Sequence, residues 1–210
     1  MNARDTILDS VRGHLGRRAN PSRPPAPPPV PLLGRIDFSI RRRIELFVER
    51  VETAAATVHQ EESPAAVLAA VAAAAGARSV ALSDAAEVLA LRDEPALAGL
   101  SWLTSQADKA ELFAADIGVT TAQWGIAETG TIALESRSER SRLASLVPPV
   151  HVALLPRSRI LCTMGELLKT LDRPLAPAVS LITGPSRTAD IELQLVLGVH
   201  GPRELHVVLV

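Results

Sequence analysis

The chain has 210 residues, of which 47% are hydrophobic and 21% charged, and its formal net charge is −1. This composition is typical of a folded globular protein, and the near-neutral charge excludes a chain that binds nucleic acid through overall basicity. The single cysteine, Cys162, excludes an intrachain disulfide and a cysteine-based zinc or iron–sulfur site, and it favours the reducing cytoplasm.

The beginning of the chain combines a helical pattern with a proline run. An apolar stripe at helical spacing lies within residues 4–16: Ile7, Leu8, Val11 and Leu15. Seven prolines follow between Pro21 and Pro31, a composition typical of a stiff spacer. We therefore predict an N-terminal helical arm and linker over residues 1–31 and one domain over residues 32–210. Two alternatives stay open for the arm, docking on its own domain or binding a partner.

Neither a membrane span nor a secretory signal is expected. No segment approaches the roughly 18 uninterrupted apolar residues that a membrane helix needs, and the first 15 residues lack an apolar signal core. The first 50 residues hold ten arginines against five acidic residues, including the run Arg41–Arg43. No aromatic residues interleave with that run for base stacking, so we interpret it as a solvated helix face.

Helical and strand patterns alternate through the rest of the chain. This alternation predicts a parallel α/β sheet with helices on its faces. The links after residues 122 and 155 are too short for a crossover helix, so the strands that they join are expected to be antiparallel or at sheet ends. The last strand is strongly apolar and expected to be central. Helices are predicted over 39–60, 63–76, 84–91, 107–115, 165–171 and 186–197, and strands over 79–82, 102–104, 117–122, 126–134, 152–155, 160–162, 179–183 and 205–210.

The first candidate site is the segment Gly184-Pro185-Ser186-Arg187-Thr188-Ala189-Asp190. A buried strand, a turn and a helix start would form an anion site, because free backbone N–H groups and the positive end of the helix dipole face the ligand there. Ser186 and Thr188 would cap the helix or donate to an oxyanion, and Arg187 would bind a carboxylate or phosphate bidentately. The alternative is a plain helix cap with an exposed arginine.

The second candidate site is Glu128-Thr129-Gly130-Thr131, a polar cluster between two apolar segments. Gly130 allows the backbone to turn or to approach a ligand closely. Glu128 suits a nucleophile, a base or an acceptor for substrate hydroxyls. The alternative is an ordinary hairpin with a solvated Glu128.

Two histidines complete the candidates. His151 follows a Pro-Pro corner and His200 lies in a turn before the last strand, and either could act as a base. Structural roles are the alternative. Loops around Glu128, His151, Arg187 and His200 could converge on one rim of the sheet. Phosphate-loop, dinucleotide and serine-elbow motifs are absent, and no histidine pair has zinc spacing, so no metal site is predicted.

In combination, the motifs resemble the LUD-domain family, in particular its lactate utilisation protein C group. The resemblance is dense from about Asp116 to Val210 and rests on the segments 118–122, 127–131, 148–151, 182–192 and 197–206. It implies a fold like the NagB/RpiA/CoA-transferase superfamily. It also implies a role in the oxidation of L-lactate to pyruvate together with two partners, one cysteine-rich and one with ferredoxin-type cysteines. With one cysteine, this chain cannot hold an iron–sulfur cluster, so the clusters are expected in those partners.

From these observations we expect an accessory or substrate-binding subunit that binds a small carboxylate and no nucleic acid. Two alternatives stay open: an independent enzyme that uses Glu128 as CoA-transferases use their glutamate, and a regulatory or scaffold protein. A homo-oligomer is a further possibility. The expected catalytic residues are Glu128 and His151, and the expected ligand-binding residues are Thr129, Gly130, Thr131, Gly184, Ser186, Arg187, Thr188, Asp190 and His200.

Overall fold

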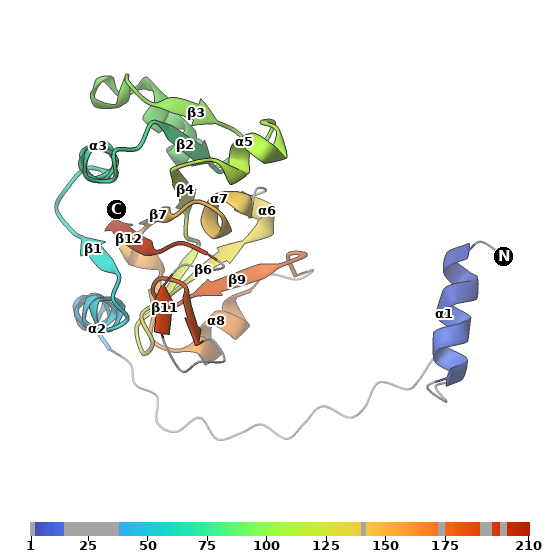
Figure 1. Cartoon of the computed structure of the whole chain (residues 1–210). Helices are drawn as coiled ribbons and strands as arrows, with labels where there is room; N and C mark the ends of the chain where they lie inside the picture. Colours follow the sequence, from blue (N-terminus) through green and yellow to red (C-terminus); the bar gives the residue numbers. More distant parts are fainter. Residues whose placement is uncertain (1–2, 15–37, 140–141, 172–174, 190–194, 198–200) are drawn as a thin grey trace. The chain divides into compact units, whose positions relative to one another are not determined.

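The computed structural model describes residues 3–14, 38–139, 142–171, 175–189, 195–197 and 201–210 (Figure 1). The chain divides into two units, Met1–Arg35 and Ile36–Val210. In the first unit, helix α1 (Ala3–His14) forms where the apolar stripe predicted a helix, and none of its residues is buried. No described helix is both long and apolar enough to cross a lipid bilayer.

A parallel six-stranded sheet forms the centre of the second unit. Its strand order is β1-β12-β7-β4-β2-β3, and every neighbouring pair is parallel. The last strand is interior, between β1 and β7, as its apolar sequence predicted. The bounds are β1 (Thr57–His59), β2 (Ser79–Leu82), β3 (Ser101–Leu103), β4 (Ile117–Thr121), β7 (Val150–Leu155) and β12 (Glu204–Leu209).

A second, four-stranded sheet has the order β8-β5-β6-β9. Its strands are β5 (Trp124–Ile126), β6 (Thr131–Glu135), β8 (Ile160–Leu161) and β9 (Val179–Ile182). The single strand predicted over 126–134 is therefore wrong: residues 127–130 form the turn of an antiparallel β5–β6 hairpin. The antiparallel pairing expected across the short links does not form, although β8 does lie at an end of its sheet, as the alternative expected. β4 and β5 lie in different sheets, as do β7 and β8, because the chain passes from one sheet to the other at each link.

Helices cover both faces of the parallel sheet, as predicted. On one face, α3 (Pro64–Ala75), α4 (Ala86–Leu89), η1 (Ala90–Asp93) and η2 (Pro95–Leu97) pack over Val80, Ile117 and Val152. On the other face, α5 (Lys109–Phe113) and α7 (Leu143–Leu146) pack over Ala81. There α2 (Ile40–Thr53) and the second sheet pack over Ala153 and Val207. The apolar residues thus form a core on each side of the sheet, which stabilises this layered arrangement.

The ends of the helices follow the capping signals in the sequence. The Ser63 side chain caps α3, and Gly76 ends it in the left-handed conformation, as predicted. Helix α8 (Met164–Thr170) begins after Thr163, whose hydroxyl accepts from the Glu166 N–H. Two further short helices are α6 (Ser136–Glu139) and η3 (Arg157–Arg159).

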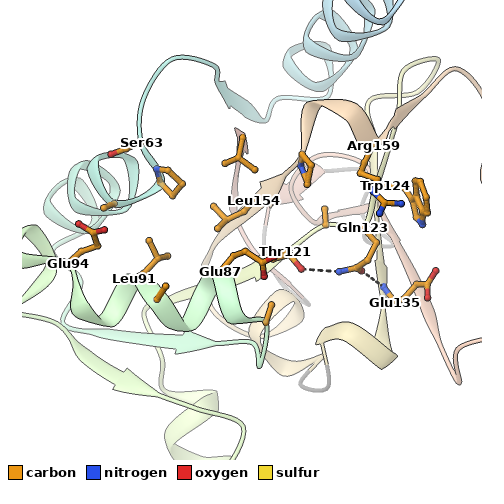
Figure 2. A pocket seen from close by; sticks show the side chains of 17 residues that line it. Ser63, Glu87, Leu91, Glu94, Thr121, Gln123, Trp124, Glu135, Leu154 and Arg159 are labelled. Carbon is orange, nitrogen blue, oxygen red and sulfur yellow. Dashed lines mark hydrogen bonds between the residues drawn. The ribbon is translucent and has the colours of Figure 1, made fainter.

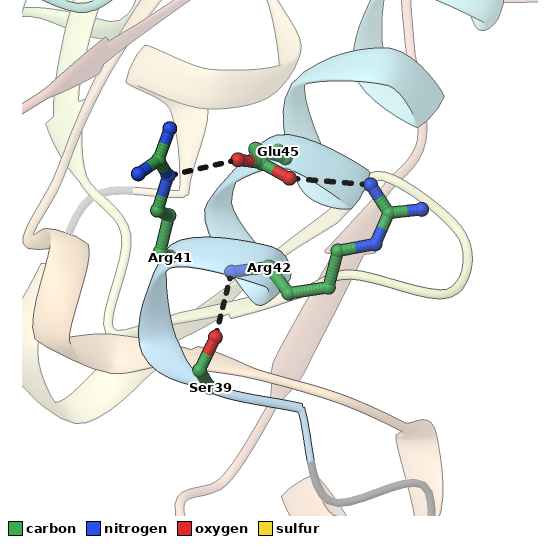
Figure 3. A network of polar contacts seen from close by, with 4 residues as sticks. All are labelled: Ser39, Arg41, Arg42 and Glu45. Atoms are coloured by element: carbon green, nitrogen blue, oxygen red, sulfur yellow. Dashed lines mark hydrogen bonds and ion pairs between the residues drawn. The ribbon is translucent and has the colours of Figure 1, made fainter.

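Helix α2 is shorter than predicted. It ends at Thr53 because Ala55 adopts a positive φ of 65°, and residues 57–59 then form β1 on the edge of the parallel sheet. At its start, Ser39 caps the helix, and both Arg41 and Arg42 pair with Glu45 on the surface (Figure 3). Their hydrogen bonds, first that of Arg42, lower the pKa of Glu45. Two arginines of the Arg41–Arg43 run thus lie on an exposed helix face with a carboxylate of the same helix.

The helix predicted over 186–197 is wrong. Residues Arg187–Ala189 form β10 and residues Leu195–Leu197 form β11, and the two strands pair antiparallel. Backbone pairing across this hairpin satisfies N–H and C=O groups that a helix would otherwise satisfy internally. The backbone N–H of Ser186 also donates to Pro202 O at 2.8 Å. The premise of a helix N-terminus at the first candidate site is therefore removed.

Candidate functional site

A cavity here called the edge crevice lies at the carboxyl ends of β4, β7 and β12 (Figure 2). Its volume is about 840 Å³. From β2 the chain continues outward to β3, whereas from β4 it continues to β7 on the other side, so the direction of winding switches between β2 and β4. Ligands of open parallel sheets bind outside the carboxyl ends of the strands at such a switch point. Topology therefore marks the edge crevice as a candidate binding site.

Arg159 and Trp124 form one end of the edge crevice. The Arg159 guanidinium carbon lies 4.6 Å from the centroid of the Trp124 ring, a cation–π arrangement (Figure 2). Among the described residues, no hydrogen bond or ion pair occupies the Arg159 guanidinium, and the buried indole Nε1 of Trp124 has no partner. A stacked guanidinium with unused N–H groups suits a carboxylate or phosphate.

Three carboxylates also line the edge crevice, those of Glu87, Glu94 and Glu135. They outnumber its one cation, Arg159, so the lining carries excess negative charge. A ligand with several anionic groups is therefore disfavoured, and one with a single anionic group and several hydrogen-bond donors fits better.

A buried carboxylate fixes the wall of the crevice between these groups. Glu139, only 2% exposed, accepts hydrogen bonds from the Thr121 N–H at 3.2 Å, from the Thr121 hydroxyl and from Gln123 Nε2 at 2.8 Å. Gln123 Oε1 in turn accepts from the Glu135 N–H at 2.6 Å. The side chains of Thr121 and Gln123 are thus held in place from behind, and ligand binding needs no reordering of this wall.

A second cavity, here called the motif cavity, lies at the amino ends of β7 and β12 and has a volume of about 230 Å³. Three of the residues predicted from the sequence line it: His151, Gly184 and Ser186. The hydroxyl-bearing residues Ser145 and Thr183 line it too. The segments around His151 and Ser186 thus come together as predicted, at the amino ends of the strands, whereas the edge crevice lies at their carboxyl ends.

His151 is the one fully buried ionisable group of the described motif-cavity lining. Its Nε2 lies 2.9 Å from Thr120 Oγ1, and its Nδ1 has no partner among the described residues. Burial lowers the pKa of His151 to about 3, so the ring is neutral near pH 7. A neutral imidazole has one donor and one acceptor nitrogen, and Nδ1 is available for a small polar ligand whichever tautomer forms.

A chain of hydroxyl groups leads from the second predicted motif to the motif cavity. Thr129 Oγ1 lies 2.6 Å from Thr131 Oγ1, which lies 2.7 Å from Thr183 Oγ1. Thr131 is buried, and Thr183 lines the cavity. The predicted ligand-binding residues Thr129 and Thr131 are therefore linked to the cavity through Thr183 and do not line it themselves.

Glu128 lies at a helix start. Its exposed carboxylate accepts a hydrogen bond from the Met164 N–H at 2.7 Å, at the first residue of α8, and it lines neither cavity. A carboxylate is favoured at this place by the helix dipole. The hairpin weighed as the alternative does form, with an exposed Glu128, and the contact with α8 was not anticipated.

The two motif glycines lie against the end of α2. Gly130 has φ 65° and Gly184 has φ 71°. A Cβ at Gly130 would lie 2.5 Å from Arg50 C, and a Cβ at Gly184 would lie 2.3 Å from Ala54 O. Both glycines therefore adopt a left-handed conformation and make a close backbone contact with α2, which a side chain would obstruct.

Arg187 contacts the same helix end. Its Nη2 donates to Ala54 O at 3.2 Å, so the guanidinium satisfies a carbonyl at the C-terminus of α2 and interacts favourably with the helix dipole. Of the remaining predicted residues, Thr188 lies in β10, where the structure describes its backbone only, and Asp190 and His200 lie outside the described residues.

The residues that form the edge crevice were missed at the sequence level. Trp124 and Arg159, which line the crevice, and Glu139, which lies behind its wall, come from three separate segments, and nothing in their spacing predicts that they lie close together. The available signal was topological. Once β2 and β4 are placed as neighbours that connect in opposite directions, the residues that follow them become candidates.

Comparison with known proteins gives a family and a fold. The sequence model of the LUD-domain family matches residues 44–210. A protein of the DUF162 family from Deinococcus radiodurans, known from its crystal structure, superposes with a TM-score of 0.61 at 25% identity, covering 82% of this chain and 99% of that chain.

Curated relatives match over shorter segments. Lactate utilization protein C of Halalkalibacterium halodurans is 39% identical over 94 residues, 42% of this chain and 41% of its own length. The protein of that name from an Exiguobacterium species is 41% identical over 117 residues, 52% of this chain and 51% of its own length. The matched segment of the chain thus spans about two fifths to a half of the length of these relatives.

Proposed function

The chain belongs to the LUD-domain family, as its motifs predicted, and from that premise we propose that it serves L-lactate utilisation as a subunit that binds a small 2-hydroxy or 2-oxo acid. The names of its relatives from Halalkalibacterium halodurans and Exiguobacterium support this role. Oxidation of lactate to pyruvate removes two electrons and two protons, so it needs an electron acceptor. With a single cysteine in this chain, we assign iron–sulfur clusters to partner proteins.

The observation that supports this proposal most directly is the motif cavity with the unpartnered Nδ1 of His151. Its volume of about 230 Å³ is below the roughly 300–1,000 Å³ typical of pockets for larger ligands. A three-carbon acid is of the appropriate size. His151 Nδ1 would bind the 2-hydroxyl or 2-oxo oxygen, and the hydroxyls of Thr183 and Ser186 would bind the carboxylate. Arg187, next to Ser186, is the candidate counter-charge, since its contact with Ala54 O leaves most of its N–H groups for a ligand.

Calorimetric titration of the full chain with L-lactate and with pyruvate tests this site. His151→Asn should weaken binding strongly, and Arg187→Lys should weaken it less than Arg187→Ala because the lysine keeps the charge and loses only the bidentate geometry. Arg159→Ala, in the edge crevice, is the matched control and should bind as the wild type does. If Arg159→Ala alone loses binding, the acid binds in the edge crevice and the assignment to the motif cavity is wrong.

A second candidate function is the binding of a larger ligand with one anionic group in the edge crevice. Its volume of about 840 Å³ and the guanidinium stacked on Trp124 favour it. Quenching of Trp124 fluorescence, measured in a Trp102→Phe background, would report such a ligand directly. Quenching that survives Arg159→Ala would count against this second candidate.

The assignment of electron transfer to partners has its own test. The purified chain should not oxidise L-lactate with an artificial electron acceptor, whereas the chain mixed with its iron–sulfur partners should. Activity of the chain alone would contradict the role of a binding subunit.

We also propose that the apolar face of α1 binds a partner, because Ile7 is 63% exposed and Val11 is 49% exposed. Ile7→Asp in the full chain should then reduce capture of the partner proteins, and Thr6→Asp serves as control.

A further inference from the structure

Two histidines that are 147 residues apart in sequence meet at the edge of the parallel sheet. His59 ends the edge strand β1, and His206 lies in the adjacent strand β12, where Thr57 is paired with His206 and His59 with Val208. His59 Nε2 lies 3.2 Å from His206 Nδ1, and the rings are 5.4 Å apart between centroids. The side chains are 19% and 15% exposed, so solvent and small ions reach both rings. Neither residue lines the motif cavity or the edge crevice.

A carboxylate faces the outer nitrogen of each ring. Glu204 Oε2 lies 3.5 Å from His206 Nε2, and Glu62 Oε1 lies 3.9 Å from His59 Nδ1. The four side chains thus form a row, Glu62–His59–His206–Glu204, in which the two inner nitrogens face each other.

The proton positions in this row conflict if both rings are neutral. Each neutral imidazole has one N–H and one lone pair. If His59 donates from Nε2 to His206, its lone pair at Nδ1 faces the Glu62 carboxylate. If His206 donates from Nδ1 instead, its lone pair at Nε2 faces Glu204. Both carboxylates face an N–H only when both inner nitrogens carry lone pairs, and two facing lone pairs need a cation between them.

We propose that His59 Nε2 and His206 Nδ1 bind a divalent transition-metal ion. Zinc lies about 2.0–2.1 Å from imidazole nitrogens, so two such ligands at a tetrahedral angle are about 3.3 Å apart. The observed separation is 3.2 Å. Carboxylates hydrogen-bonded to the outer nitrogens of metal-bound histidines orient the rings and raise their basicity. Glu204 lies beside the outer nitrogen of His206, and Glu62 lies on the same side of His59 at a longer distance.

The two histidines supply only part of a coordination shell. In the part of the chain that the structure describes, no three histidine, cysteine, aspartate or glutamate side chains are arranged to hold one metal ion together. The site therefore supplies two protein ligands and leaves the other positions to water or to an external group. No spacing in the sequence predicts it, because the pair forms only through strand pairing.

Calorimetric titration of the untagged full chain with zinc chloride, in a buffer that does not bind metals, tests the proposal. One zinc ion should bind per chain. His59→Gln and His206→Gln should each abolish saturable binding, and Glu204→Gln should weaken it roughly tenfold. His14→Gln is the matched control, because His14 lies on the exposed helix α1 and contacts only Ser10 O among the described residues, and it should bind as the wild type does.

A second measurement covers variants that fold poorly. Zinc should raise the unfolding temperature of the wild type and of His14→Gln, whereas circular dichroism should show folded His59→Gln and His206→Gln proteins whose unfolding temperature does not respond to zinc. Absence of saturable binding to the wild type, or equal binding by either histidine variant, would overturn the metal site. The pair would then be hydrogen-bonded or would share a proton.

Discussion

The edge crevice lies at the carboxyl ends of the strands of the parallel sheet and the motif cavity at their amino ends, and the two cavities are lined by different kinds of side chain. The edge crevice has charged side chains, a stacked guanidinium and a wall fixed by buried Glu139. The motif cavity has a neutral buried histidine, small residues and hydroxyls. Topology marks the first, and the family motifs mark the second. A general rule about ligands at strand ends and a resemblance in sequence can thus indicate different places in one protein, and chemistry has to decide between them.

The motifs also show that convergence in space does not by itself assign binding. Gly130, Gly184 and Arg187 all contact the last turn of α2 between Arg50 and Ala54. These residues hold the β5–β6 turn and the segment before β10 against one helix end. In the motif cavity, therefore, part of the motif supports the fold and part of it, His151 and Ser186, faces the cavity.

The largest expected effect separates these two roles. Gly184→Ala places a Cβ 2.3 Å from Ala54 O at a φ of 71°, so we expect a loss of about 3–5 kcal/mol in the free energy of unfolding. Gly76→Ala is the matched control, because its φ is 61° and a Cβ there meets nothing within 4 Å. It should cost only about 1 kcal/mol. Urea denaturation measures both.

Equal losses in the two glycine variants would show that backbone conformation alone matters at Gly184. In that case the contact with α2 would not explain the glycine, and its place beside the motif cavity would regain a ligand-related interpretation.

The next effect depends on pH and concerns His151. Its pKa is about 3 when folded and 6.5 when unfolded, so below pH 6.5 the unfolded chain binds more protons and stability falls with decreasing pH. The slope is about 1.4 kcal/mol per pH unit between pH 6.5 and about pH 3. The stabilisation that His151 contributes is therefore fully present above pH 6.5 and is lost progressively down to about pH 3. Urea denaturation of the wild type and of His151→Asn at pH 7 and pH 5 isolates this effect. Parallel pH dependence in the two proteins would mean that His151 is protonated as easily in the folded chain.

Sequence patterns predicted the parts of the fold that depend on local signals. Ser63-Pro64 and Gly76 delimited α3, and the apolar run near the C-terminus indicated an interior strand. The patterns failed where pairing with distant segments decided the structure. The segment from Arg187 to Leu197 has an apolar spacing compatible with a helix, yet its ends pair as β10 and β11. Similarly, residues 57–59 continue a helical pattern and instead join β12.

For the candidate site, the sequence predicted part of the grouping of residues but not the contacts that each of them makes. His151, Gly184 and Ser186 do meet at one cavity, because their loops all lie at the same edge of the sheet. Glu128 contacts the start of α8, and Arg187 contacts the end of α2 through one of its N–H groups, contacts that the sequence did not predict. Unpaired N–H and C=O groups at helix ends attract charged side chains just as ligand sites do, and a sequence does not distinguish the two.

A third, smaller effect tests the wall of the edge crevice. Glu139→Ala removes the acceptor of three hydrogen bonds and leaves the Thr121 N–H and Gln123 Nε2 without it. We expect a loss of about 2 kcal/mol in the free energy of unfolding. Glu135→Ala, a nearby carboxylate that lines the crevice, should change stability by less than about 0.5 kcal/mol. Urea denaturation of both variants checks this, and equal losses would show that the buried carboxylate does not support the wall.

The smallest effect on stability is expected for variants of Arg159, which should have the largest effect on ligand binding in the edge crevice. Arg159 is exposed and its one described interaction is the stacking on Trp124, so Arg159→Ala should cost no more than about 0.5–1 kcal/mol. Arg159→Lys should cost less still, because a lysine also interacts with the ring face. A residue that contributes little to folding and yet presents unused N–H groups beside a cavity of about 840 Å³ is placed for a ligand. If urea denaturation shows that Arg159→Ala loses more than about 2 kcal/mol in the free energy of unfolding, Arg159 is a structural residue. Of the two cavities, only the motif cavity would then remain a candidate binding site.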